Sequence, residues 1–157
     1  VKNFPHMAIL HSFSKAYGMA GNRIGYIIAH PDIIAIVKNK TQWSNVSYVS
    51  VGAATIALDH EGYFTKMRED INQRRDAFTE FLKKSGYSVL PSKINAVLIK
   101  FSSEDEGNRF VEFLKQHTIV VSHGNGNSNI GLDKSFVRIA IGTKDQMKKL
   151  ISVLVNF

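Results

Sequence analysis

The chain has 157 residues, of which 44% are hydrophobic and 21% charged, an ordinary balance for a soluble globular protein. It has no cysteine, which excludes a disulfide framework and a thiolate metal site. The formal net charge is +7, but the 20 Lys and Arg residues form no long block, so solvated helix faces explain them better than a nucleic-acid surface. No apolar run approaches membrane-spanning length. We therefore expect no nucleic-acid or membrane partner, and a cytoplasmic location is the default.

The first 60 residues predict a strand, a glycine-rich segment, a second strand and two helices. The apolar runs Met7–Leu10 and Ile24–Ala29 predict the strands. The segment His30–Asp32 is typical of a helix start, because its proline stands at an early helical position. We expect a loop over Thr41–Tyr48 and a mostly buried helix over Val49–His60.

The remaining residues predict alternating helices and strands after a joint at Gly62. The order is helix, two strands, helix, two strands, helix, and the first helix ends near Gly86. Two capping boxes, Ser103-x-x-Glu106 and Thr143-x-x-Gln146, predict the starts of the later helices. The expected strands are Tyr87–Leu90, Ala96–Phe101, Thr118–Ser122 and Phe136–Ile141, with a Gly- and Asn-rich loop over 123–134. This alternation indicates an α/β layer with helices packed on a small sheet, and a domain boundary near residue 60.

The segment between the first two strands has an odd composition for a connecting loop. It combines hydroxyls, a lysine, an arginine and glycines at fixed spacing: Ser12-x-Ser14-Lys15-x-x-Gly18-x-x-Gly21-x-Arg23-x-Gly25-Tyr26. Serine and arginine are phosphate-binding types, and the guanidinium offers a fixed fork of donors. Partial burial would lower the pKa of Lys15 and expose a nucleophilic amine. A lysine beside a phosphate cradle suggests Schiff-base chemistry on a phosphorylated aldehyde, of which pyridoxal phosphate is the commonest.

This pattern resembles the cofactor-lysine motif of the fold-type I pyridoxal-phosphate enzymes. It is most similar to the class I/II aminotransferases, which include the aspartate and histidinol-phosphate aminotransferases. The resemblance implies that Lys15 forms an aldimine with pyridoxal 5′-phosphate and that Ser12 and Arg23 hold the phosphate, with Ser14 a second hydroxyl of that site. It also implies a fold: the end of a large cofactor-binding domain over residues 1–60, then a small C-terminal α/β (α+β) domain over 61–157.

Arg138 is the second charged residue of interest, because it interrupts an apolar strand. A guanidinium there costs free energy unless it is paired. The residues alone leave an even choice between a structural role, with an acidic partner or a solvent-facing edge, and a ligand role. The context Arg138-x-x-x-Gly142-Thr143 resembles the arginine that binds the substrate α-carboxylate in that family, and Asn95 matches a turn asparagine that shapes the substrate mouth. The six histidines show no pairing typical of a metal site, so we expect none.

The function implied by the resemblance is an aminotransferase that moves an amino group between an amino acid and a 2-oxo acid. Lys15 would be its catalytic base, and a homodimer is usual in the family. The family's cofactor aspartate and stacking aromatic precede the lysine, and nothing here precedes Val1. We therefore expect a C-terminal portion that lacks a complete site, exposes apolar surface and self-associates. Two alternatives stay open: a decarboxylase or acyltransferase of the same fold, or a non-catalytic fragment. The sequence does not fix the amino donor or acceptor.

Overall fold

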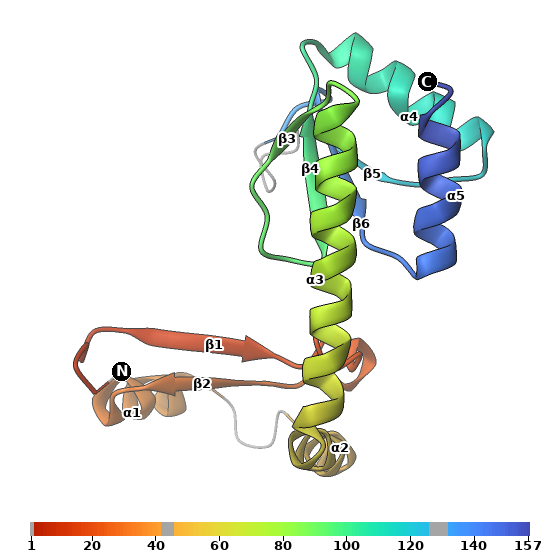
Figure 1. Cartoon of the computed structure of the whole chain (residues 1–157). Helices are drawn as coiled ribbons and strands as arrows, with labels where there is room; N and C mark the ends of the chain where they lie inside the picture. Colours follow the sequence, from red (N-terminus) through yellow and green to blue (C-terminus); the bar gives the residue numbers. More distant parts are fainter. Residues whose placement is uncertain (1, 42–45, 126–131) are drawn as a thin grey trace. The chain divides into compact units, whose positions relative to one another are not determined.

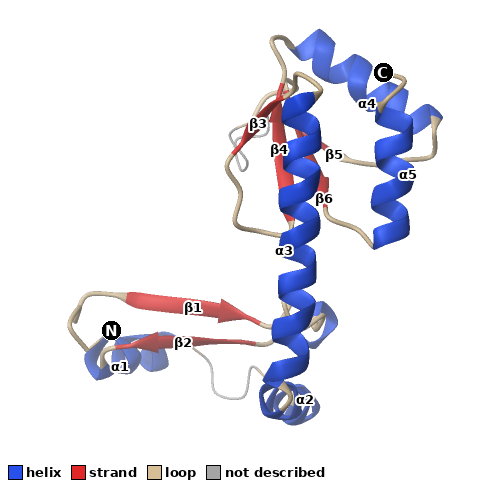
Figure 2. Cartoon of the chain, in the orientation of Figure 1, coloured by secondary structure: helices blue, strands red, loops and turns tan. Residues whose placement is uncertain are grey.

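The computed structural model describes residues 2–41, 46–125 and 132–157. Its contacts divide the chain into two compact units, residues 1–68 and 69–157 (Figures 1 and 2). The division falls inside a helix, whereas the sequence placed a boundary near residue 60. The assignment of residues 1–60 and 61–157 to a large and a small domain stays a prediction. Among the described residues, no helix is long and apolar enough to cross a membrane.

The first unit opens with a β-hairpin whose strands confirm the sequence prediction. Strand β1 (Ala8–Ser12) pairs antiparallel with β2 (Gly25–Ala29), and the register sets Ser12 opposite Gly25. A Cβ on Gly25 would lie 2.5 Å from the His11 carbonyl oxygen, so close strand pairing requires glycine here. A short 3₁₀ helix, η1 (Ala20–Asn22), lies between the strands.

The helices of the first unit also begin where the sequence predicts. Helix α1 (Pro31–Lys40) has its proline at the first position, and the N–H of Asp32 donates to His30 Nδ1 at 3.4 Å. Part of the predicted loop before α2, residues 42–45, lies outside the described residues.

Helix α2 (Tyr48–Asp59) differs from its prediction in burial. Its buried residues are small (Ser50, Ala54 and Ala57), while Tyr48 is 93% exposed. The predicted mostly buried helix is therefore a helix with one narrow buried face. The break after α2 falls at His60 rather than at Gly62, which lies inside α3 (Glu61–Lys84).

The second unit is an antiparallel sheet with helices on one face. The strands β3 (Ser88–Leu90), β4 (Ala96–Lys100), β5 (Ser122–His123) and β6 (Phe136–Ala140) lie in the order β3-β4-β6-β5. Alternate residues of the two inner strands face a core shared with α3, α4 (Glu104–Gln116) and α5 (Lys144–Leu154). The core consists of Phe78, Leu82, Val97, Ile99, Phe101, Phe110, Leu114, Val137, Ile139, Met147, Leu150 and Leu154.

One strand prediction in this unit is wrong. The run Thr118–Ser122 was expected to be a strand, but pairing begins only at Ser122. Thr118 has a left-handed φ of 60°, and the N–H of Ile119 donates back to the Leu114 carbonyl at 2.9 Å. These residues finish the end of α4 instead of joining the sheet.

The helix starts predicted from the two capping boxes are confirmed, but only one of the two boxes is complete. Thr143 and Gln146 form both bonds of a capping box at the start of α5. Ser103 accepts from the N–H of Glu106 at 3.2 Å, while the Glu106 carboxylate accepts from Ser102 instead of completing the box. Helix α3 ends at Lys84, and Gly86 follows with a φ of 88°.

Candidate active site

The lysine turn, residues 15–18, begins three residues after the end of strand β1. The N–H of Gly18 donates to the Lys15 carbonyl at 3.1 Å, and the N–H of Met19 donates to the Phe13 carbonyl at 3.0 Å. Gly18 has a φ of 65°, which suits glycine, and Phe13 is 3% exposed and anchors the start of the turn. The Lys15 side chain is exposed, so the partial burial expected from its neighbours is not present in this chain.

The predicted phosphate ligands lie at the same end of the hairpin. The N–H of Ser14 donates to Ser12 Oγ at 3.1 Å, which leaves the Ser12 hydroxyl its own proton to donate. Arg23 has a left-handed φ of 49°, and its Nη1 donates to the Ala20 carbonyl at 3.2 Å. Because Arg23 is exposed, the rest of its donor fork remains open to an acceptor.

The strand register explains why residues from the beginning and the end of the loop lie at the same end of the hairpin. Ser12 pairs with Gly25, and the N–H of Phe13 donates to the Ile24 carbonyl at 3.2 Å, so Arg23 follows the same closed end of the hairpin. Two hydroxyls, a guanidinium and a primary amine thus share one end of an element. This donor set fits a phosphorylated aldehyde, with oxygen and nitrogen donors for the phosphate and the amine for the aldehyde carbon.

Arg138 lies at the centre of β6 in the second unit, paired with Leu98 on one side and Ser122 on the other. It alternates with the core residues Val137 and Ile139, which places it on the opposite face of the sheet. No carboxylate of the described residues forms an ion pair with it, and its strand is not an edge. The two structural roles weighed for this arginine are therefore absent from the described part of the chain.

Asn95 precedes β4, and hydrogen bonds to its own carbonyl and to the preceding one hold its main chain in place. Its carbonyl accepts from the N–H of Ile141 at 2.9 Å. The preceding carbonyl, that of Ile94, accepts from Nη1 of the buried Arg75 at 3.4 Å. Asn95, just before β4, and Arg138, on the neighbouring strand β6, thus belong to the second unit, whereas the lysine turn belongs to the first.

A polar cluster beside the lysine turn was missed by sequence reasoning. The Tyr17 hydroxyl donates to Glu61 Oε2 at 2.7 Å, and Arg68 Nη2 bonds both Glu61 and Thr65 Oγ1. The hydrogen bond to Glu61 raises the pKa of Tyr17, and the same bond, with Arg68, lowers the pKa of Glu61. Tyr17 and Glu61 are 44 residues apart, so no local pattern links them. The Glu61–Arg68 pair, seven residues apart on one helix, was open to prediction from spacing.

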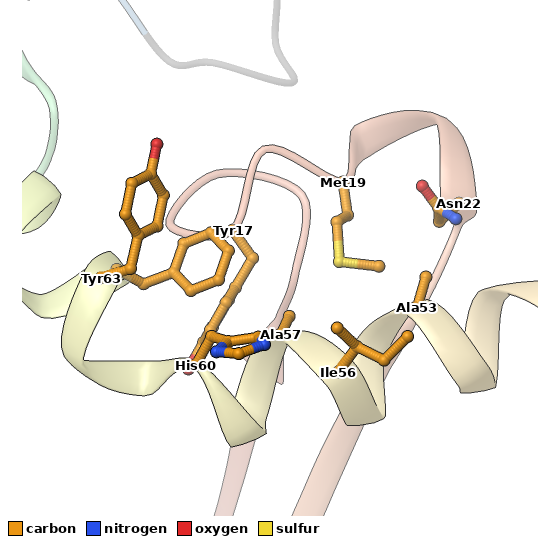
Figure 3. A pocket seen from close by; sticks show the side chains of 9 residues that line it. Tyr17, Met19, Asn22, Ala53, Ile56, Ala57, His60 and Tyr63 are labelled. Atoms are coloured by element: carbon orange, nitrogen blue, oxygen red, sulfur yellow. The ribbon is translucent and has the colours of Figure 1, made fainter.

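An apolar pocket of about 520 Å³ lies in the first unit between the loop that follows β1, helix α2 and the start of α3 (Figure 3). Met19 points from the loop toward Ile56 and Ala53 of helix α2. Its lining residues are Tyr17, Met19, Asn22, Ala53, Ile56, Ala57, His60, Tyr63 and Phe64. None of the predicted cofactor residues is among them, so the pocket is distinct from the Ser12–Arg23 donor set.

The fold and the donor set define an α/β protein with a lysine turn suited to a phosphorylated aldehyde. The sequence model of the family "Aminotransferase class I and II" matches residues 1–154. The chain therefore belongs to the class I and II aminotransferase family.

Individual relatives agree with this family. The histidinol-phosphate aminotransferase of Geobacillus sp. (strain WCH70) is 34% identical over 156 residues, covering 99% of this chain and 41% of the relative. The crystal structure of histidinol-phosphate aminotransferase from Sinorhizobium meliloti in complex with pyridoxal-5′-phosphate matches with a TM-score of 0.78 and 26% identity. That match covers 97% of this chain and 41% of the other. The crystal structure of L-threonine-O-3-phosphate decarboxylase from Porphyromonas gingivalis matches with a TM-score of 0.76 and 28% identity, over 98% of this chain and 47% of the other. The chain spans less than half the length of these relatives.

Proposed function

We propose that this chain is the part of a pyridoxal-phosphate-dependent aminotransferase that carries the cofactor lysine. The observation that supports it most is the closed end of the hairpin, where the exposed Lys15 amine shares one loop with the Ser12 hydroxyl and the open fork of Arg23. The substrates proposed are an amino acid and a 2-oxo acid. Because relatives are named histidinol-phosphate aminotransferases, histidinol phosphate is the first amino donor to test. A homodimer and a cytoplasmic location belong to the same proposal.

Each predicted residue has a defined task in this proposal. The hydroxyls of Ser12 and Ser14 and the guanidinium of Arg23 donate to the cofactor phosphate. Lys15 Nζ attaches the cofactor covalently and, when released by substrate, takes the proton from the substrate α-carbon as general base. Bound pyridoxal phosphate supplies the electron sink that makes this proton acidic. Arg138 receives the substrate carboxylate through its paired donors, with Asn95 at the substrate mouth.

The first test locates the lysine that takes up the cofactor. Pyridoxal phosphate is added to the purified chain below one equivalent, the visible absorption is recorded, and borohydride reduction fixes the attachment for peptide mass spectrometry. We expect Lys15 to be modified first, and the band to be lost in Lys15→Ala. Lys38→Ala, which removes an exposed lysine of α1, is the matched control and should keep the band. Modification spread over the surface lysines, with none favoured at position 15, would overturn the proposal.

The second test concerns Arg138. In the active enzyme that contains this chain, Arg138→Lys should raise the KM for the amino donor about tenfold, because an ammonium cannot reproduce a bidentate guanidinium contact worth roughly 1–2 kcal/mol. Attachment of the cofactor at Lys15 should not change. Arg109→Lys, on the exposed face of α4, is the matched control. An unchanged KM would remove Arg138 from the site.

A decarboxylase is the second candidate, favoured by the match to L-threonine-O-3-phosphate decarboxylase. Product analysis separates the two reactions. An aminotransferase converts the amino donor to an oxo product and leaves the amino group on the cofactor, whereas a decarboxylase releases CO₂ and retains the amine. Release of CO₂ from an amino-acid phosphate without an oxo product would favour the decarboxylase.

A further inference from the structure

Tyr17 links the lysine turn to helix α3 through both its ring and its hydroxyl. The ring packs against Phe13, with centroids 4.7 Å apart, and against Phe64, with centroids 4.8 Å apart. The hydroxyl donates to Glu61 Oε2 at 2.7 Å. Tyr17 is the third residue of the turn that Lys15 opens and Gly18 closes, so fixing Tyr17 restricts the backbone that presents Lys15.

Glu61 is held in turn by residues of its own helix. Arg68 Nη2 donates to Glu61 Oε1, and it also donates to Thr65 Oγ1 at 2.7 Å. The Arg68 guanidinium lies 5.8 Å from the centre of the Tyr17 ring, within the range of a cation–π contact. Glu61 stands in the first turn of α3, where the helix dipole also favours a carboxylate. The carboxylate therefore has charge-assisted partners that keep it aimed at the Tyr17 hydroxyl.

The hydroxyl group of Tyr17 contributes something that the packing of its ring does not. Phe13 and Phe64 alone would hold a phenylalanine at position 17, so the hydroxyl and its partners are not required to fill space. The hydroxyl and its partners instead fix the position of the turn, because a directional hydrogen bond to a fixed carboxylate sets where the turn lies along the start of α3. Lys15 itself is exposed, and the described residues leave its amine without a hydrogen bond or ion pair that would orient it. Its placement thus depends on the backbone of the turn.

We infer that Tyr17, Glu61 and Arg68, the tyrosine anchor, are positioning residues that fix the lysine turn so that Lys15 Nζ meets the cofactor aldehyde. This inference rests on the proposed function, in which Lys15 attaches pyridoxal phosphate. It assigns no contact with the cofactor to the anchor itself, which acts through the backbone between Phe13 and Met19.

The test compares two variants with a matched control. Tyr17→Phe keeps the ring and removes the hydroxyl, and Glu61→Gln keeps an acceptor but removes the charge that Arg68 holds. Glu80→Gln is the control, because Glu80 forms an ion pair with Lys84 at 2.7 Å on the same helix and belongs to the other unit. The first readout, made without cofactor, is amide hydrogen exchange at Gly18 and Met19 by NMR. We expect exchange about fivefold faster in Tyr17→Phe, a smaller increase in Glu61→Gln and none in Glu80→Gln.

The second readout is attachment of pyridoxal phosphate at Lys15, by visible titration and peptide mass spectrometry. We expect the apparent Kd to rise about fivefold in Tyr17→Phe while Lys15 remains the modified residue. A double variant should be no worse than Tyr17→Phe, because both changes break the same contact. A merely structural role would lower the urea midpoint and leave attachment by the fully folded chain unchanged, which would overturn the inference.

The two proposals fail in different ways. If the unsubstituted chain attaches no cofactor at Lys15, the proposed function fails, and the role assigned to the anchor falls with it. If Lys15 is modified but Tyr17→Phe matches Glu80→Gln in both amide exchange and the apparent Kd for pyridoxal phosphate, the role inferred for the tyrosine anchor is overturned. The proposed function then stands.

Discussion

The two units of the chain bury apolar side chains to very different degrees. Residues 69–157 enclose a continuous core in which Phe110 and Leu82 are 0% exposed. In the described part of residues 1–68, the buried apolar side chains are only Phe13, Ala54 and Ala57, while Leu10 is 78% and Val49 77% exposed. The second unit is therefore stabilised by its own core, whereas the first, which carries the lysine turn, presents apolar surface to its surroundings.

The largest expected effect is the loss of a core side chain from the second unit. Phe110 contacts the rings of Tyr87, Phe101 and Phe157, with centroids 5.7, 4.9 and 5.2 Å away. Phe110→Ala should lower the free energy of unfolding of this unit by about 3–5 kcal/mol, because it removes buried apolar area and leaves a cavity. Hydrogen exchange of the β4 and β6 amides measures this value.

The matched change in the first unit is Leu10→Ala on β1. Because Leu10 is exposed, its truncation should change the free energy of unfolding by less than about 0.5 kcal/mol. Equal losses of unfolding free energy for Phe110→Ala and Leu10→Ala would contradict this difference, since both units would then depend equally on burial.

A smaller effect concerns association between copies of the chain. The exposed apolar side chains of the first unit predict self-association, measured as the weight-average mass in sedimentation equilibrium. Leu10→Ser with Val49→Ser should raise the dissociation constant at least about thirtyfold, because each of the two exposed side chains contributes roughly 1 kcal/mol when covered. Val120→Ser, at a residue that is 90% exposed in the other unit, is the control. A monomer at every concentration would contradict the prediction.

The smallest effect is the pH dependence of a helix start in the second unit. Hydrogen bonds from the Ser102 hydroxyl and N–H lower the pKa of Glu106 below its ordinary value. A carboxyl group with a lowered pKa stabilises the fold above its ordinary pKa of about 4.3, and this stability is lost as the pH falls through the lowered value. Glu106→Gln should therefore be less stable than the unsubstituted chain at pH 7, and the difference should shrink toward pH 3.

Urea unfolding at a series of pH values measures that difference. Glu112→Gln, on the exposed face of the same helix, is the control. A difference that grows as the pH falls would show that the Glu106 carboxylate does not stabilise the start of α4.

Local features of this fold were predictable from sequence, and features that depend on distant partners were not. Thr143 and Gln146 form their capping box because both partners lie within one turn of helix. The strand predicted at Thr118–Ser122 is wrong because Thr118, with its left-handed φ, terminates α4. The apolar run that follows Thr118 gives no sign of this backbone conformation. The exposure of Lys15 depends on which surfaces lie over the turn, and composition carries no information about that.

In the candidate site, too, residues of one local motif were predictable and contacts between distant residues were not. The resemblance to the cofactor-lysine motif placed Ser12 and Arg23 in one proposed phosphate site, and the hairpin register sets the segments that carry them at one end of the strands. Their roles, and those of Ser14, Lys15, Asn95 and Arg138, stay predictions. The Tyr17–Glu61 contact joins residues 44 positions apart, and only the packed structure brings them together.

Gly25 has a consequence for how mutations are tolerated along the lysine motif. A side chain there would collide with the His11 carbonyl, whereas a Cβ on Gly21 meets nothing within 4 Å. In a library of variants selected only for folding, position 25 should therefore remain glycine, whereas position 21 should accept other residues. If selection for activity restores glycine at position 21, that glycine serves a ligand or another surface rather than the packing of this chain.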